Sequence, residues 1–545
     1  MELAPAATTG PGAVDSEPLT RAQWDVFMSI MDTVISCRSD EPLNPSTVRR
    51  SETEYNKIVH DIRYETTLDT ATVDAFLAEK PSEMPLFQDM VKRVLAGFPH
   101  DKLSTLGNVL SLMNNWATSF PVTGYLCSFP KLALENRIVV LHSWRNSSLA
   151  SFRVLFKQLT TIAKHTYVRT SSLFSLVSGF PSAPSGWYST ESFPFDFKQL
   201  GPSREPVYLE TDAIVVGSGC GAGVVARNIA TAGHRVMVVD KSYHLPTFLL
   251  PLDHSEAFSH LFEQSGLLVS EDGSITVTSG SCFGGGGTVN YSASLQTQNT
   301  VREEWADKRG LTFFKSSEFQ TCLDNVCKQM GVSDEYIRHN QGNSVLLEGG
   351  RKLGFTAKAV PQNTAGSEHY YGHCSLGCWR GEKQGPVNGW FPDAAKCGAE
   401  FREGFKVDRV LLSKRSGRQI AYGVTGTWIP RGCGDELAKA VTIKAKRVII
   451  SAGSLCSPII LKNSGLKANN TTPVPFWSDC RRAQNKHIGR NLHLHPITFV
   501  GGVFKEETRP WEGGILTSVV TSLDNLDGKG HGVRQAFYPY AYGLS

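Results

Sequence analysis

A glycine-rich turn directly after an apolar, β-branched run is the feature of this sequence best suited to chemistry. Residues 213–216 predict a buried strand, and the turn GSGCGAG follows at once. Gly217 permits a sharp bend, Gly219 lets the backbone approach a pyrophosphate, and Ala222 lets a helix pack closely on the strand. The helix predicted over 224–231 would point its free amides and positive dipole end at the phosphates. The candidate cofactor-binding residues of the turn are Gly217, Ser218, Gly219, Cys220, Gly221, Ala222 and Gly223.

An acidic residue at the end of the next predicted strand extends this pattern. The run RVMVV ends at Asp240, roughly 20 residues beyond the turn, where a carboxylate can accept hydrogen bonds from an adenosine ribose. Its negative charge argues against a ribose that carries a 2′-phosphate. The strand, turn, helix and acid together predict a dinucleotide site, although the pattern alone fits NAD as well as FAD.

A second glycine-rich segment, SCFGGGGTVNYSASLQT, holds consecutive glycines at 284–287, followed by Thr288 and Asn290. Consecutive glycines expose backbone amides with little steric hindrance, which suits the close approach of a flat ring or a phosphate. A flexible loop is the alternative explanation, and the glycines alone do not decide between the two.

Two cysteines in CSLGC, Cys374 and Cys378, raise the question of a metal site. Their spacing lacks a second well-placed pair, and neither His369 nor Cys397 completes a zinc pattern. We therefore predict no metal and interpret these cysteines as structural thiols.

The elements that must position these residues change in kind along the chain. Residues 1–19 are rich in Pro, Gly, Ala and Thr and predict a disordered lead-in. From there to about 173, apolar residues recur at helical spacing, beginning with a helix for which Thr20 is a suitable N-cap. A stretch rich in Pro, Ser, Gly and aromatic residues ends near 205, and short β-branched runs then alternate with helical segments. This order predicts a helical domain followed by an α/β domain.

Composition narrows the class of protein. At 545 residues the chain is too long for one core, because single cores stop growing at roughly 250–300 residues. The 55 basic and 51 acidic residues leave a net charge of +4 without a basic run that would follow a phosphate backbone, which excludes nucleic acid as a partner. The first residues do not resemble a signal peptide, and no apolar run reaches the roughly 18 residues of a membrane span. We expect an intracellular protein whose membrane association would be peripheral. The last residues, AYGLS, do not form a peroxisomal signal of the S-K-L type, and a peroxisomal location stays open.

Several motifs, in order, resemble those of the glucose–methanol–choline (GMC) oxidoreductases, and within them the long-chain fatty alcohol oxidases. They are GSGCGAGVVA, GGGGTVNYSAS, VREEWA, HCSLGCWRGEKQG, RVIISAGSLCSPIILKNSGL, HIGRNLHLHP and VFKEETRPWEGGILTSVVT. The likeness covers about 205–545, and the helical N-terminal third is similar to the extra domain of that branch. One departure is that only Val289 separates Thr288 from Asn290, where the family has two residues between them.

This resemblance implies FAD rather than NAD and an α/β, FAD-binding, Rossmann-like GMC fold. Gly285, Gly286, Thr288 and Asn290 would then lie against the flavin, and Val407 would bind the adenine through its backbone. Ser451, Ala452 and Gly453 would close the nucleotide site. The divisions that follow are a lead-in at 1–19, a helical domain and linker at 20–205, FAD-binding parts at 206–300 and 401–495, an intervening flavin- and substrate-proximal region at 301–400, and the start of a substrate-binding domain at 496–545.

The activity implied by the resemblance is oxidation of a long-chain primary alcohol to an aldehyde, with O2 reduced to hydrogen peroxide. The family's catalytic base is a histidine near the C-terminus, and the motif that carries it is absent before Ser545. We therefore expect an incomplete chain with little or no turnover. His493 and His495 are weak candidates for a base, because an imidazole titrates near neutrality.

Two other interpretations stay open at this point. The chain could be a flavin-binding relative without oxidase turnover, or an NAD-dependent dehydrogenase. The second leaves the glycine segment at 284–290 unexplained.

Overall fold

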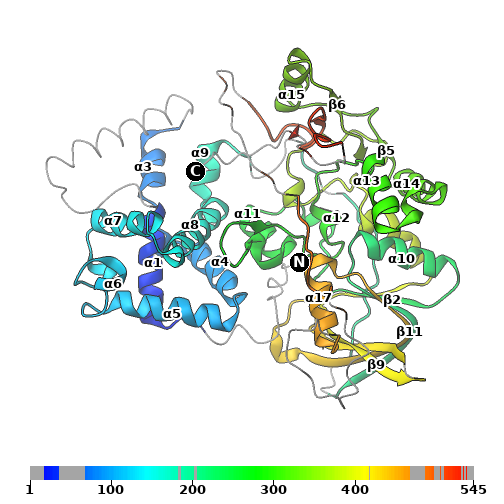
Figure 1. The fold of residues 1–545 in the computed structure, drawn as a ribbon, viewed down its shortest axis with the longest axis horizontal. Coiled ribbons are helices and arrows are strands. Elements are labelled where there is room, and N and C mark those ends of the chain that lie inside the picture. The colour runs from blue at the N-terminus through cyan, green and yellow to red at the C-terminus, as the bar shows by residue number, and fades with distance from the viewer. Residues whose placement is uncertain are drawn as a thin grey trace. The chain divides into compact units, whose positions relative to one another are not determined.

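The computed structural model of this chain is a mixed α/β protein. It describes residues 17–35, 68–181, 186–188, 190–201, 205–416, 418–466, 485, 487–495, 497, 502, 504, 508–528, 532 and 535–536. These residues fall into a helical unit, drawn from Thr8–Ala183 and Asp253–Ser279, and an α/β unit, drawn from Pro184–Leu252 and Gly280–Tyr540. Figure 1 shows most helices of the first unit in blue and cyan, and part of the main sheet of the second in yellow.

The helical unit begins with a helix whose start is set by Thr20. The Thr20 hydroxyl accepts the N–H of Gln23 at 3.4 Å, and Oε1 of Gln23 accepts the N–H of Thr20 at 2.9 Å. This reciprocal capping box confirms Thr20 as the N-cap. The elements of the unit are α1 (Arg21–Ile35), α3 (Thr70–Ala78), α4 (Pro85–Ala96), α5 (His100–Asn114), α6 (Phe120–Thr123), α7 (Leu134–Arg145), α8 (Ala150–Thr170), α9 (Ser172–Ser178), α11 (His254–Leu261), β3 (Leu268–Val269) and β4 (Thr276–Val277).

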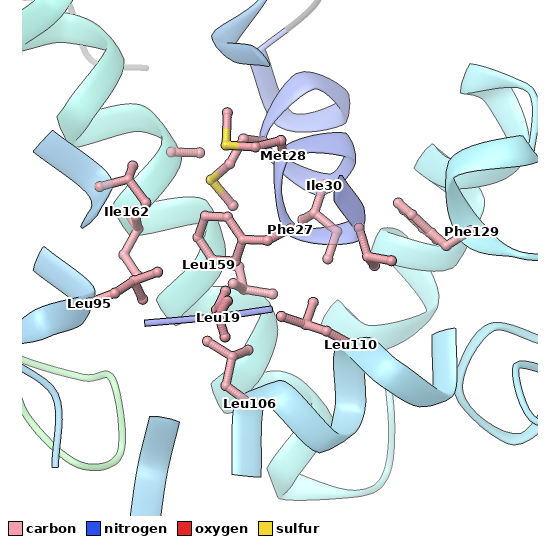
Figure 2. Packing of buried hydrophobic residues seen from close by; sticks show 14 of the residues in the cluster. Leu19, Phe27, Met28, Ile30, Leu95, Leu106, Leu110, Phe129, Leu159 and Ile162 are labelled. Atoms are coloured by element: carbon pink, nitrogen blue, oxygen red, sulfur yellow. The ribbon is translucent and has the colours of Figure 1, made fainter. Parts of the chain in front are cut away.

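A continuous apolar core holds these helices together. Phe27 and Ile30 of α1 are fully buried, and Figure 2 shows Phe27 beside Leu159 and Ile162 of α8. Burying a side chain of this size contributes roughly 1.5–3 kcal/mol. The helical spacing in the sequence therefore marks the core-facing side of α1 correctly.

Residues 253–279 belong to a different unit from the one that the sequence predicts. The sequence places residues 253–279 within the FAD-binding part at 206–300, whereas the structure packs them in the helical unit. Leu267 is fully buried in the helical core. The Arg169 guanidinium lies 3.7 Å from the centre of the Phe258 ring and donates to the Ser265 carbonyl at 2.7 Å. Local periodicity does not show such a return of the chain, because each of these contacts joins residues far apart in sequence.

The α/β unit is built on a six-stranded mixed sheet in the order β8-β2-β1-β11-β10-β9. Strands β8, β2, β1 and β11 are parallel to one another, and β10 is antiparallel to both of its neighbours. The connection between the neighbouring strands β1 and β2 runs through α10. The bounds are β1 (Val207–Val216), α10 (Cys220–Thr231), β2 (Val236–Val239), β8 (Glu400–Arg402), β9 (Phe405–Arg415), β10 (Arg418–Trp428) and β11 (Lys439–Ile450).

Both faces of β1 are covered, which explains its continuous apolar run. Ala213 and Val215 pack with Ala222 and Ala226 of α10, while Ile214 and Val216 face a second cluster that includes residues of β9 to β11. Small alanines on α10 allow the helix to lie close to the strand, as the sequence predicts for Ala222.

A smaller sheet, β13-β12-β6, joins residues of the last predicted division to the intervening region. Val519 of β12 pairs with Lys358 of β6, and α15 packs against both strands. The other helices and strands of this unit are α12 (Gly286–Val289), α13 (Asn299–Glu303), α14 (Ser317–Gln329), β5 (Val332–Ser333), α15 (Gln341–Lys352), β6 (Ala357–Ala359), β7 (Gln362–Asn363), α16 (Phe391–Lys396), α17 (Gly453–Asn463), β12 (Ser518–Val520) and β13 (Gln535–Ala536), with short 3-10 turns such as η7 (Cys374–Leu376) between them.

Candidate nucleotide-binding site

The glycine turn lies at the carboxyl end of β1, where open parallel sheets bind ligands. The N–H of Gly217 donates to the carbonyl of Val239 at 2.8 Å, which ties the turn to the end of β2. Gly217 has φ +100°, and a Cβ there would lie 2.7 Å from the carbonyl carbon of Ser451. Only glycine fits this position, for reasons of backbone conformation and of space together.

Ser218 connects the predicted motifs to one another. Its hydroxyl donates to Oδ2 of Asp240 at 2.6 Å, and its N–H donates to the same oxygen at 2.8 Å. The hydroxyl also accepts the N–H of Gly284 at 2.9 Å. The first glycine turn, the acid at the end of β2 and the second glycine segment therefore meet at one side chain.

The carboxylate of Asp240 is held in a fixed orientation. Its other oxygen, Oδ1, accepts the N–H of Ser242 at 2.8 Å. Burial raises the pKa of Asp240, although the hydrogen bonds from Ser218 and Ser242 act in the opposite direction. A carboxylate oxygen has two lone pairs, so these bonds leave acceptor capacity for a ribose hydroxyl.

The second glycine segment forms a tight turn that leads into α12. Gly284 and Gly285 have φ +102° and +55°, and a Cβ on Gly285 would lie 3.0 Å from Cα of Gly219. The two glycine-rich backbones are thus in direct contact. By contrast, a Cβ on Gly219 or on Gly286 would meet no atom within 4 Å. The described residues leave open space beside both glycines, as a cofactor held by backbone amides would require.

Residues 451–453 complete the same end of the sheet. The N–H of Ser451 donates to the carbonyl of Val216 at 2.7 Å, and a Cβ on Gly221 would lie 3.2 Å from Oγ of Ser451. Ala452 is the N-cap of α17, and Gly453 begins that helix with φ +78°. The structure therefore brings these residues beside the first glycine turn.

The side chains of Val407, Thr288 and Asn290 contact other parts of the protein. The Val407 side chain is buried in the same apolar cluster as Val216 and Val239, beneath the end of the sheet. The Thr288 hydroxyl donates to the carbonyl of Phe283 at 3.2 Å, and the Asn290 side chain accepts the N–H of Ser292 at 3.1 Å. Contact of these residues with a cofactor stays a prediction.

A buried lysine is part of this region, and the sequence gives it no role. Lys383 is 2% exposed, and its Nζ donates to the carbonyl of Asn290 at 2.8 Å. It also lines a cavity of about 30 Å³ together with Gly287, Thr288 and His244. Burial, and to a smaller extent Arg431, lowers the pKa of His244 to about 4, so that imidazole is neutral at physiological pH. The only signal in the sequence is a basic residue inside the motif HCSLGCWRGEKQG.

The weak candidates for a catalytic base lie elsewhere. His493 and His495 are exposed, and Nδ1 of His493 is 2.8 Å from the carbonyl oxygen of Asn491. The hydrogen bond of His493 is therefore made within its own segment. Their catalytic role stays a prediction.

The described residues bear on metal binding and on membrane insertion. They hold no group of three or more His, Cys, Asp or Glu side chains arranged to bind a metal ion. Within the same residues, no helix combines the length and the apolar character needed to cross a bilayer. Peripheral association with a membrane stays a prediction.

Comparison with known proteins agrees with the resemblance read from the motifs. Residues 258–497 match the family model described as GMC oxidoreductase. Over these residues the chain is similar to the GMC oxidoreductases. Members of the GMC oxidoreductase family bind FAD.

Several GMC oxidoreductases are similar to this chain in sequence. The long-chain-alcohol oxidase FAO4B of Arabidopsis thaliana is 35% identical over 330 residues, which cover 59% of this chain and 41% of the relative. The long-chain-alcohol oxidase FAO1 of the same plant is 35% identical over 330 residues, or 59% and 40% of the two chains. An uncharacterised GMC-type oxidoreductase of Mycobacterium tuberculosis (strain ATCC 25618 / H37Rv) is 27% identical over 326 residues, or 59% and 47%.

The chain spans about two fifths of the length of the plant relatives that it matches. Among solved structures, pyridoxine 4-oxidase from Mesorbium loti is 13% identical, with a TM-score of 0.35, over 47% of this chain and 52% of that one.

Proposed function

We propose that this chain holds FAD in a Rossmann-like site and acts in the oxidation of a long-chain primary alcohol, with O2 as the electron acceptor. The observation that carries the proposal is the meeting of the three motifs at Ser218, which bonds to Asp240 and to the N–H of Gly284. A pyrophosphate would lie in the open space beside Gly219, at the N-terminus of α10. Asp240 would accept from the ribose.

The substrate class comes from the relatives alone. The plant proteins that match are named long-chain-alcohol oxidases. Residues 258–497, which match the GMC oxidoreductase model, include the second glycine segment and Ser451 to Gly453. Bound FAD supplies a hydride acceptor that O2 can reoxidise, with hydrogen peroxide as the product. A long-chain primary alcohol is therefore the substrate to test first.

The residues of this chain bind and orient in that reaction. The fixed carboxylate of Asp240 and the glycine backbones would hold the nucleotide end of the cofactor. Lys383 places a buried positive charge beside Asn290 and the second glycine segment, where it would stabilise negative charge on a bound group. His493 and His495 stay weak candidates for the base that takes the hydroxyl proton.

The test begins with the purified 545-residue chain and its visible absorbance. We expect a yellow protein that releases FAD on acid precipitation, and no retention of NAD in a parallel incubation. Adding dodecanol under nitrogen should then bleach the flavin band, but slowly, because little turnover is expected of this chain. A colourless chain that does not take up added FAD would overturn the proposal. Bound flavin that dodecanol leaves oxidised would support a non-catalytic flavin-binding relative instead.

A further inference from the structure

A buried triad of side chains lies in the segment that the sequence analysis assigned to structural thiols. Nε2 of His369 is 3.1 Å from Sγ of Cys374, and Nδ1 of the same ring is 3.0 Å from Oε2 of Glu382. Cys374 and His369 are 2% and 8% exposed. A thiol beside an imidazole that a carboxylate orients is the arrangement used to activate a cysteine nucleophile.

The surrounding charges favour the ionised form of the triad. Arg380 pairs with the outer oxygen of Glu382 at 2.6 Å, which holds that carboxylate in place. Burial opposes ionisation of the Cys374 thiol, but the positive charges of His369 and Lys383 outweigh it and lower the pKa of Cys374 to about 7. Burial likewise opposes the charged imidazole, yet Cys374 and Glu382 raise the pKa of His369. These charges favour the thiolate form of Cys374 and the imidazolium form of His369.

The space beside the triad limits what could react with it. His369 lines a cavity of about 10 Å³ together with Gln362, Thr364 and Thr517. A cavity of this size holds about one water molecule. Hydrogen peroxide is little larger than water and reacts with thiolates, so it matches a space of this size beside His369.

We propose that Cys374 is a peroxide-reactive thiol, activated by His369 and oriented through Glu382, that hydrogen peroxide converts to a sulfenic acid. The thiolate sulfur forms a bond to one peroxide oxygen as the O–O bond breaks. The leaving hydroxide takes the proton held on His369 and departs as water, so the sulfur is oxidised by two electrons and the peroxide is reduced. This modification goes beyond the proposed alcohol oxidation, which would itself generate the oxidant.

Oxidation of Cys374 would alter packing beside the backbone that we propose binds the cofactor. The turn η7, which begins at Cys374, packs against α12 of the second glycine segment. A sulfenic acid adds a polar oxygen to a side chain that now has little free space. Flavin retention is therefore a second property that oxidation of Cys374 should alter.

The size of the expected effect depends mainly on His369. A thiol with the usual pKa near 8.5 is roughly 3% ionised at pH 7, so lowering the pKa to about 7 raises the thiolate fraction about fifteenfold. A weaker base is also a weaker nucleophile, which cancels roughly fivefold of that gain. Proton donation to the leaving oxygen contributes roughly 10²-fold or more. Loss of the imidazole should therefore cost at least tenfold in rate.

The experiment measures sulfenic acid formation at each cysteine of the full-length chain. Reduced protein receives added hydrogen peroxide and a dimedone-type trap at pH 7, and peptide mass spectrometry follows the label with time. Because peroxide is added, the outcome does not depend on the alcohol oxidase proposal. Cys322, an exposed cysteine on α14, is the matched internal control.

We expect Cys374 to be labelled at least tenfold faster than Cys322, although Cys374 is buried. His369→Asn should remove this advantage and leave the labelling of Cys322 unchanged, and unfolding in urea should equalise the two cysteines. Should His369→Asn fail to fold, the wild-type pH profile serves instead, because labelling of Cys374 should level off by about pH 8, below the range of an ordinary thiol. Labelling of Cys374 no faster than Cys322 in the folded chain would overturn the proposal.

Discussion

Replacing Gly219 by alanine should weaken flavin binding without unfolding the protein. A Cβ at this position meets no atom of the described chain within 4 Å, and φ is −68°, which any residue adopts. Gly219 is the N-cap of α10, where alanine is worse than glycine by up to roughly 1 kcal/mol. Alanine also lowers the conformational entropy of the unfolded chain, which stabilises the folded protein by about 0.4–1 kcal/mol. The free energy of unfolding should therefore stay within about 1 kcal/mol of wild type.

The same methyl group would occupy the space proposed for the pyrophosphate. Loss of close backbone approach should weaken FAD binding by at least about tenfold, which corresponds to about 1.4 kcal/mol. Two neighbouring glycines provide matched controls. Gly217→Ala should cost about 2–5 kcal/mol of stability, because φ is +100° and the Cβ meets Ser451. Gly233→Ala should cost about 1–2 kcal/mol, because φ is +80° in open space.

The assay pairs urea unfolding, followed by circular dichroism, with titration of FAD into the apo-protein, followed by flavin fluorescence. Our reasoning requires Gly219→Ala to separate the two measurements, with stability kept and affinity lost. Affinity within twofold of wild type would refute the placement of the pyrophosphate. A loss of stability as large as that of Gly217→Ala would refute the open space beside Gly219.

Three further predictions follow from side chains described above or from their surroundings. Ser218→Ala should lower the free energy of urea unfolding by about 1–3 kcal/mol, because Asp240 loses a donor and the N–H of Gly284 loses its acceptor. Ser218→Thr, which keeps the hydroxyl, is the control. Leu267→Ala should destabilise the helical unit by about 2–5 kcal/mol, whereas the same change at Leu353, which is 72% exposed, should have an effect below about 0.5 kcal/mol. Burial, and to a smaller extent Arg169, lowers the pKa of His165 to about 4, so the unfolded chain binds the proton more readily. The free energy of unfolding should have its full value above about pH 6.5 and fall by at most about 3 kcal/mol toward pH 4. In His165→Gln, the free energy of urea unfolding should depend less on pH within that window.

Patterns that are local in sequence predicted much of the structure around the first glycine turn. The strand before Gly217, the helix after it and the acid at Asp240 follow from residue type and spacing, and the structure brings all of them to one end of the sheet. Strand β1 was recognised because apolar side chains on both faces leave a continuous run. The contact of Gly285 with Gly219 joins two motifs that the sequence singled out separately.

Interactions between distant segments could not be read in this way. The triad of His369, Cys374 and Glu382 has no regular spacing, so the sequence does not indicate the hydrogen bonds that join these side chains. Lys383 belongs to a recognised motif, yet only the folded chain shows that its charge is buried. The position of residues 253–279 depends on contacts such as that of Arg169 with Phe258, which no local period encodes.

The discontinuous helical unit has a consequence for synthesis on the ribosome. Its core needs Leu267, but β1, α10 and β2 lie in the chain between Ala183 and that residue. At about 5–20 residues per second, translation of the intervening segment takes roughly 4–17 s. During that interval the nascent helices expose an apolar surface that Leu267 later covers, while the first strands of the sheet are already leaving the exit tunnel. Chaperones that bind nascent apolar surfaces would have their longest access to this protein at that stage.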